Sequence, residues 1–333
     1  MLSVLFSRIK ESSSIGSWLK NKLLMVWRLI DKYFFILIGL YFLRTAILTS
    51  LYSNAGVDYK AYFYLLAFAS FTAYSDMRRD VKWLPFIILC IPFLLIIQYI
   101  SVHGYAFWGK MLSWQISRKI VFDLNPLFSK IPLNDAAFMR VYQSDTLTWF
   151  MRLVYQNGFV LPVILPLYRA CISKDLKKAI RYALSAHIFQ VFLITPFYLM
   201  FHLQEVWYVL GHPDGMARNF TPEQAAGWTL NCFPSMHTSI AFAMFLLVLR
   251  EKNKLFKWIW GFFCLSVIFS TMYLEIHWVI DVIGGLILAY GTVKLVDFIL
   301  AKADNLLNKP LGRFYYRHQE STYLTKYLLD IMD

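Results

Sequence analysis

Long apolar runs constrain this chain more than any other feature of its sequence. A helix rises about 1.5 Å per residue, so about 20 apolar residues cross a bilayer core of roughly 30 Å. The sequence offers eight candidate spans, near residues 33–51, 61–75, 83–101, 155–172, 182–203, 237–249, 258–276 and 278–299. The second and sixth are short, which leaves a count of seven open. We therefore predict an all-α, polytopic membrane protein with about eight transmembrane helices.

The composition supports the same class. Hydrophobic residues make up 59% of the 333 residues, whereas a soluble domain usually has about 45–50%. The opening "MLSVLFSRIKESSSIGSW" lacks the apolar core and cleavage site of a signal peptide, so the first span is expected to stay as an anchor. Four cysteines are scattered without C-x-x-C pairing, which favours buried free thiols.

The basic residues predict an orientation. With the N-terminus placed in the cytoplasm, the inner segments carry 22 of the 33 Lys and Arg residues and the outer segments carry 8. Such an excess is typical of cytoplasmic loops. The net charge of +13 is thus attributed to the face that meets anionic lipids, and no nucleic-acid partner is expected.

This orientation predicts three parts. Residues 1–32 form a cytoplasmic amphipathic segment, residues 33–299 an integral membrane domain, and residues 300–333 a basic cytoplasmic tail. Residues 102–154 contain six basic residues among short apolar pieces, which indicates interfacial helices on the outer leaflet. Whether this segment selects an acceptor is left open by the sequence. No internal repeat or flexible linker divides the chain.

The segment "NCFPSMHTSIAFAMF" (231–245) leads from a polar loop directly into an apolar helix. Ser235 is a favoured helix N-cap, and Pro234 keeps the preceding residue out of the helical region. The first turn of the helix then presents free N–H groups and a positive dipole end, which suit a phosphate. His237 lies in that turn. An ordinary capped helix with an interfacial histidine is an equally good interpretation of this segment alone.

The segment "YLEIHWVIDVIGG" (273–285) pairs His277 with Asp281 at a spacing of four. On a helix the two side chains share one face, and the carboxylate can accept the ring's Nδ1–H. The other nitrogen, Nε2, is then available as a nucleophile or base. An aspartate inside an apolar run is costly and is usually functional. Gly284 and Gly285 would allow close packing against a neighbouring helix; the alternative is a purely structural His–Asp pair.

Both histidines are expected at the outer ends of their spans, so they can converge. Together they supply a positioned nucleophile, an acid for the leaving group and a helix N-terminus for the anion. This set suits phosphoryl transfer without a metal or other cofactor. Arg218 is the only Arg or Lys in 204–236 and is the first candidate for a phosphate clamp. Four other arginines are alternatives: Arg44, Arg140, Arg152 and Arg169.

The residues "FPSMH" followed by "YLEIHWVIDVIGG" resemble the second and third signatures of the type 2 phosphatidic acid phosphatase superfamily, and most closely its inositol phosphorylceramide synthase branch. The resemblance covers 231–290 strongly. It implies a six-helix catalytic core, His277 as nucleophile, Asp281 as its orienting carboxylate, His237 as general acid and Ser235 as a phosphate contact. The chain departs from the superfamily's phosphatases at Ser270-Thr271, where they usually carry Ser-Arg, and it lacks their basic first signature.

The sequence thus predicts a membrane enzyme that takes a phosphoryl or phospho-head group from a phospholipid on the extracytoplasmic face. The group passes to water, or to an alcohol or lipid acceptor. One alternative is a metal-dependent membrane hydrolase, with His237, His277, Asp281 and Glu275 as ligands. The other is a lipid transporter or scaffold without catalysis. The membrane concerned, cell or organelle, and the oligomeric state are left open.

Overall fold

The computed structural model describes residues 2–117 and 122–307, and 76% of these residues are helical. It divides into two compact units, residues 1–74 and 75–333. The expected class, an all-α polytopic membrane protein, is confirmed. The expected tail 300–333 lies partly in α13 and otherwise outside the described residues.

The first unit is a pair of helices. Its elements are α1 (Leu2–Tyr52), α2 (Val57–Thr72) and the beginning of the short helix η1 (Ala73–Ser75). Phe42 of α1 stacks on Phe63 of α2, with ring centroids 6.4 Å apart. The Phe71 ring packs against Gly39, where any larger residue would clash, because a Cβ at this position would lie 2.6 Å from the ring. The expected boundary at residue 32 falls inside the continuous helix α1.

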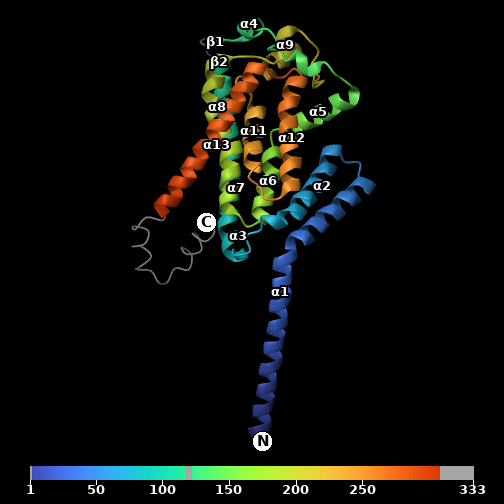
Figure 1. Cartoon of the computed structure of the whole chain (residues 1–333), viewed down its shortest axis with the longest axis vertical. Helices are drawn as coiled ribbons and strands as arrows, with labels where there is room; N and C mark the ends of the chain where they lie inside the picture. Colours follow the sequence, from blue (N-terminus) through green and yellow to red (C-terminus); the bar gives the residue numbers. More distant parts are fainter. Residues whose placement is uncertain (1, 118–121, 308–333) are drawn as a thin grey trace. The chain divides into compact units, whose positions relative to one another are not determined.

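The second unit is a helical bundle with a small cap of loops and short helices (Figure 1). Its elements are α3 (Trp83–Ser117), β1 (Phe122–Asp123), α4 (Asn125–Phe128), η2 (Ala137–Arg140), α5 (Asp145–Asn157), α6 (Leu161–Ile172), α7 (Leu176–Ala183), η3 (Leu184–Ile188), α8 (Phe189–Met200), β2 (Phe201–His202), α9 (Val206–Leu210), α10 (Pro222–Trp228), α11 (Met236–Val248), α12 (Lys254–Tyr273) and α13 (Val279–Leu307). The strands β1 and β2 form one short parallel pair that ties residues 122–123 to the end of α8.

Five helices in the described part of the chain are long and apolar enough to cross a membrane. They lie at Asn21–Tyr52, Trp83–Gly104, Leu176–Met200, Lys254–Tyr273 and Val279–Asn305. The helices α5 and α6 meet at a bend of 60° and would make a sixth span if counted together. The two short candidates of the sequence correspond to α2, with 16 residues, and α11, with 13.

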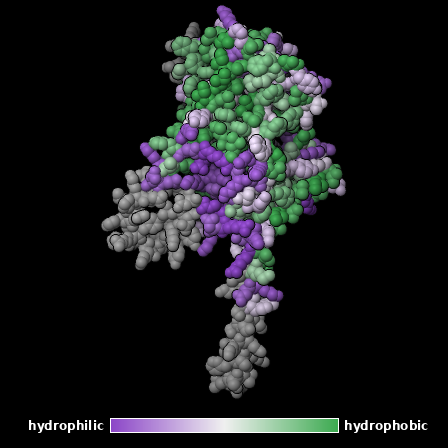
Figure 2. All heavy atoms as spheres, viewed as in Figure 1, coloured by the Kyte–Doolittle hydropathy of each residue, from purple (hydrophilic) through white to green (hydrophobic). Residues whose placement is uncertain are grey.

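The short helix α11 lies in the centre of the bundle and packs mainly against α12 and α13. Ile240, Ala243 and Leu247 on it are fully buried. A helix that is apolar on all sides belongs in such a core. The outer surface of the bundle is also apolar: Figure 2 shows hydrophobic side chains over much of its visible face, and Phe262 and Ile287 are two-thirds exposed. Lipid can cover such a face without cost.

A buried network of charges closes the end of the bundle where α11 turns into α12. Arg169 donates to Asp76 at 2.5 Å and to Glu251 at 2.8 Å, and all three side chains are 1% exposed. Lys178 joins both carboxylates, and the Tyr182 hydroxyl donates to Glu251. Burial by itself raises the pKa of Asp76, but its hydrogen bonds and the neighbouring positive charges outweigh burial and hold the pKa well below its usual value.

Candidate active site

The helix α11 begins as the sequence predicts. Ser235 is its N-cap, and the Ser235 hydroxyl accepts a hydrogen bond from the Thr238 amide at 3.3 Å. His237 occupies the second position of the helix and is half-buried. Its ring is therefore presented at the end of α11 where the helix dipole is positive.

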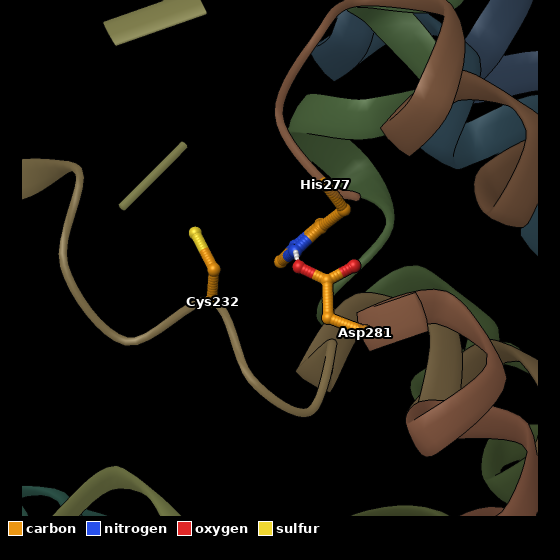
Figure 3. Close-up of side chains that lie close together, drawn as sticks. All are labelled: Cys232, His277 and Asp281. Carbon is orange, nitrogen blue, oxygen red and sulfur yellow. Dashed lines mark hydrogen bonds and ion pairs between the residues drawn. The ribbon is translucent and has the colours of Figure 1, made fainter. Parts of the chain in front are cut away.

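His277 and Asp281 are joined by a hydrogen bond, with 3.1 Å between Nδ1 and Oδ2 (Figure 3). His277 does not lie on the helix, as the spacing suggested, but in the connection just before α13, which begins at Val279. Asp281 lies in the first turn of α13. His277 is 5% exposed and Asp281 fully buried. With Nδ1 directed at the carboxylate, Nε2 is the nitrogen left for chemistry.

The two histidine segments are fastened together by their backbones. The Ser235 amide donates to the Asp281 carbonyl at 3.0 Å. A Cβ on Gly285 would lie 2.6 Å from the Ser235 carbonyl oxygen, so only glycine permits this approach. The expectation that Gly284 and Gly285 allow close packing of a neighbouring helix is confirmed. The ring centroids of His237 and His277 are 6.3 Å apart as a result.

Both rings line a cavity of about 670 Å³ at this end of the bundle. Arg218 lines it too, whereas Ser235 and Asp281 lie behind its wall. The structure therefore brings His237, His277 and Arg218 to one space and places Ser235 and Asp281 as supports. The volume is within the ordinary range for a small-molecule site.

Two aromatic rings hold His237. Tyr155, near the end of α5, stacks on the imidazole with centroids 4.3 Å apart, and Phe159 meets it edge-on at 4.6 Å. Phe159 lies at the break between α5 and α6. Neither residue was identified from the sequence, because their contact with His237 joins segments about 80 residues apart. The π-face of Tyr155 is favourable for a protonated imidazole.

Arg218 is held by two carboxylates. Its guanidinium donates to Asp214 at 2.7 and 3.0 Å and to both oxygens of Glu205. Burial lowers the pKa of Arg218, but the bonds and charges of Asp214 and Glu205 outweigh it and raise the pKa above its ordinary value. Burial raises the pKa of Asp214. The hydrogen bonds from the Arg218 side chain and from two backbone amides outweigh burial and lower the pKa below its usual value. The group of three thus carries a net negative charge.

The four alternative arginines have other surroundings. Arg140 pairs with Glu275 at 2.8 Å and with Asp135. Arg152 donates to the Gly215 carbonyl at 2.7 Å. Arg169 belongs to the buried network at the opposite end of α11, and Arg44 lies in the first unit. None of the four lines the cavity.

Asn134 is a residue that the sequence did not single out. Its backbone carbonyl accepts from the Val279 amide at 2.8 Å, and its side-chain oxygen accepts from the Ile280 amide at 3.0 Å. It thereby satisfies the first N–H groups of α13. Its own amide group donates to the Phe128 carbonyl at 3.0 Å. An asparagine in the segment 102–154 thus fixes the start of the helix that carries Asp281.

One cluster in the described residues has the composition of a metal site. The ligand atoms of Cys232, His277 and Asp281 lie within 4.8 Å of one another, and Figure 3 shows Cys232 beside the other two on a separate stretch of the chain. These atoms are engaged in hydrogen bonds: Nδ1 of His277 with Asp281, and the Cys232 thiol with the carbonyls of Thr229 and Ile276. Burial raises the pKa of the Cys232 thiol, which disfavours the thiolate that a metal requires.

Glu275, the fourth ligand of the metal hypothesis, points elsewhere. It accepts from Arg140 and lies 2.7 Å from Nδ1 of His212. It is not on a helix, since α12 ends at Tyr273. The ligand set of His237, His277, Asp281 and Glu275 is therefore not brought together.

Residues 185–301 match the family model of the PAP2 superfamily. The matched stretch runs from η3 into α13 and contains both histidine segments. Searches of curated proteins and of solved structures found no match. The match to the PAP2 superfamily supports the assignment of an enzyme of the phosphatase or phosphotransferase type that acts on lipids. No homologue supports the narrower inositol phosphorylceramide synthase resemblance.

Proposed function

We propose that this chain is a membrane-embedded lipid phosphotransferase or phosphatase that works through a phosphohistidine on His277. The proposal is carried by one relationship: an imidazole oriented by a buried carboxylate shares a cavity with a second imidazole, 6.3 Å away between ring centroids. A pair of histidines at this separation can reach opposite sides of one phosphate.

In the first step, Nε2 of His277 attacks phosphorus. The P–N bond forms while the P–O bond to the leaving alcohol breaks, and the leaving oxygen takes the proton from the imidazolium of His237. Asp281 accepts the Nδ1–H bond throughout and stabilises the positive charge that the His277 ring acquires.

In the second step, His237 acts as the base. It takes a proton from water or from an acceptor alcohol, whose oxygen attacks phosphorus as the P–N bond breaks. Water gives a phosphatase and an alcohol gives a transferase. We favour the transferase, with inositol phosphorylceramide synthase-like specificity, because the "FPSMH" and "YLEIHWVIDVIGG" motifs resemble that branch.

The anion is held by three features in this proposal. The first turn of α11 offers a positive dipole end, which Ser235 maintains as its N-cap. His237 adds its proton. Arg218 adds a guanidinium that already has two carboxylate partners, so its contribution depends on how far the phosphate displaces them.

We also propose that this cavity faces the extracytoplasmic side and that both termini are cytoplasmic. The distribution of Lys and Arg along the sequence supports this orientation. A membrane-impermeant thiol reagent tests it on single-cysteine variants in a background without the native cysteines. In intact vesicles whose extracytoplasmic face is outside, we expect labelling of Ala217→Cys and no labelling of Lys252→Cys. The reverse pattern would refute the orientation.

The reaction is tested by incubating the purified protein with phosphorus-labelled phospholipids, with and without inositol, ceramide and diacylglycerol. Acid-labile label on His277, located by peptide mapping, is the expected result. In His237→Gln both the formation and the decay of the label should slow, because this residue is the acid of the first step and the base of the second. Full turnover by His277→Ala would refute His277 as the nucleophile, whereas no turnover of any lipid by the native protein would favour transport or scaffolding.

A further inference from the structure

A second hollow of about 560 Å³ lies in the bundle between α3, α6 and the α7–η3 junction. Eight of its eleven lining residues are apolar, among them Ile97 of α3 and Val163 and Leu167 of α6. No Lys, Arg, Asp or Glu is among the eleven. We call this hollow the chain groove. Its walls suit hydrocarbon and give a charged head group no partner.

Three polar residues line the chain groove, and two of them, Ser101 and His187, bond to one another; the third is Gln98. The Ser101 hydroxyl donates to the Ile97 carbonyl at 2.8 Å. Its oxygen also lies 3.3 Å from Nε2 of His187. A hydroxyl has a single hydrogen, so in this arrangement Nε2–H of His187 donates to the Ser101 oxygen. The pair therefore does not require a polar ligand.

The chain groove adjoins the candidate active site at Phe159. This residue lines both hollows, and its ring meets His237 edge-on at 4.6 Å between centroids. One aromatic ring therefore separates the groove from a proposed catalytic histidine. The position of Phe159 follows from the break between α5 and α6, where Gly158 lies so close to Val267 that a Cβ would approach it to 2.7 Å.

The groove also opens towards the apolar surface of the bundle. Val160 and Ile164 belong to its lining and are 61% and 51% exposed. A hydrocarbon chain can enter past such side chains from the bilayer without leaving an apolar environment.

We propose that the chain groove binds one hydrocarbon chain of the lipid whose phosphate is held between His237 and His277. This inference rests on the proposed function and adds a chain-binding site to it. If the phosphate occupies the active-site cavity and the chain occupies the chain groove, the part of the lipid that joins them lies beside Phe159. Chain length then contributes to binding, since each methylene seated in the groove adds dispersion contacts with its wall.

The first test is kinetic. Ile164→Trp fills the mouth of the groove from a half-exposed position, and Ile287→Trp on α13 is a matched control at an exposed apolar position outside both hollows. Ile164→Trp should lower kcat/KM for a long-chain substrate by about tenfold, because the chain loses its dispersion contacts with the groove wall. Its kcat/KM for a short-chain, water-soluble analogue should match that of Ile287→Trp. Equal losses on both substrates would overturn the proposal.

The second test does not depend on activity. The protein is reconstituted in nanodiscs with a phospholipid that carries a diazirine on its acyl chain, and the labelled peptides are mapped after illumination. We expect saturable labelling of α6 that is lost in Ile164→Trp and kept in Ile287→Trp. The same result is expected when each change is combined with His277→Ala, because chain binding does not require catalysis. Equal labelling of the two tryptophan variants would overturn the groove. Labelling as expected without turnover on any lipid would uphold the groove and refute the proposed reaction.

Discussion

Asn134 and Ile280 are joined by a hydrogen bond of 3.0 Å that fixes the start of α13. The bond links the cap of the bundle to a residue next to Asp281. Since Asp281 orients His277, the precision of the candidate active site depends on a residue that is not part of the cavity lining.

Asn134→Ala should therefore affect stability and rate together. Loss of this cap is expected to cost about 1–2 kcal/mol of stability, and turnover should fall because Asp281 is less firmly placed. Asn253→Ala is the matched control: Asn253 caps α12 at the opposite end of α11, with 2.9 Å to the Phe256 amide. It should lose similar stability at unchanged turnover per folded molecule. If both variants turn over equally, Asn134 is only a structural cap.

Asp281→Asn should leave the fold intact and lower kcat by about a hundredfold or more, because an amide no longer fixes the tautomer or stabilises the charged ring. KM should change little. Asp304→Asn makes the same chemical change later in α13, at a partly exposed pair with Lys177, and should be neutral. Steady-state kinetics on one lipid substrate compares the two; full kcat in Asp281→Asn would contradict the orienting role.

Removing a carboxylate partner of Arg218 and removing Arg218 itself should have opposite effects on substrate affinity. Glu205→Gln keeps the size of the side chain but removes a negative charge and one of the two oxygens that accept from Arg218, so KM for an anionic lipid should fall several-fold. Arg218→Gln should raise KM by about tenfold, the loss of one charge-assisted contact. A thermal melt accompanies the kinetics. If Arg218→Gln lowers only the melting temperature and Glu205→Gln leaves KM unchanged, the arginine is structural.

Arg169→Met is expected to destabilise the protein by about 3–5 kcal/mol, because Asp76 and Glu251 lose their buried partner. The activity of the molecules that remain folded should not change, since the network lies at the far end of α11 from His237. Denaturation in detergent measures the first effect and kinetics the second. A loss of kcat without a loss of stability would contradict a purely structural network.

The same network predicts the response to acid. The folded-state pKa of Asp76 lies below its unfolded value of about 3.9. The stabilising contribution of Asp76 is therefore fully present above the unfolded-state pKa. It is lost as the pH falls from the unfolded-state pKa to the folded-state pKa. Melting temperatures measured downward from neutral pH should fall more steeply below about pH 4 in the native protein than in Asp76→Asn. Parallel curves would argue against this contribution.

Excess chelator should leave turnover unchanged if Cys232, His277 and Asp281 act without a metal. Cys232→Ser should also be tolerated, because the thiol only donates to two backbone carbonyls. Loss of activity in chelator that zinc restores would favour the metal-dependent alternative.

The sequence alone determined the membrane class, the cap at Ser235 and the pairing of His277 with Asp281. These follow from hydrophobicity and from spacings of a few residues, which local geometry fixes. Only the tertiary structure decided that Arg218 is shared by Glu205 and Asp214, that Tyr155 and Phe159 hold His237, and that Asn134 caps α13. The last two depend on contacts between segments tens to more than a hundred residues apart. Arg218 and Asp214 have the same spacing as His277 and Asp281. Nothing local indicates that Glu205 also binds the guanidinium, because the separation of 13 residues between Glu205 and Arg218 allows many loop conformations and tertiary packing decides which one forms.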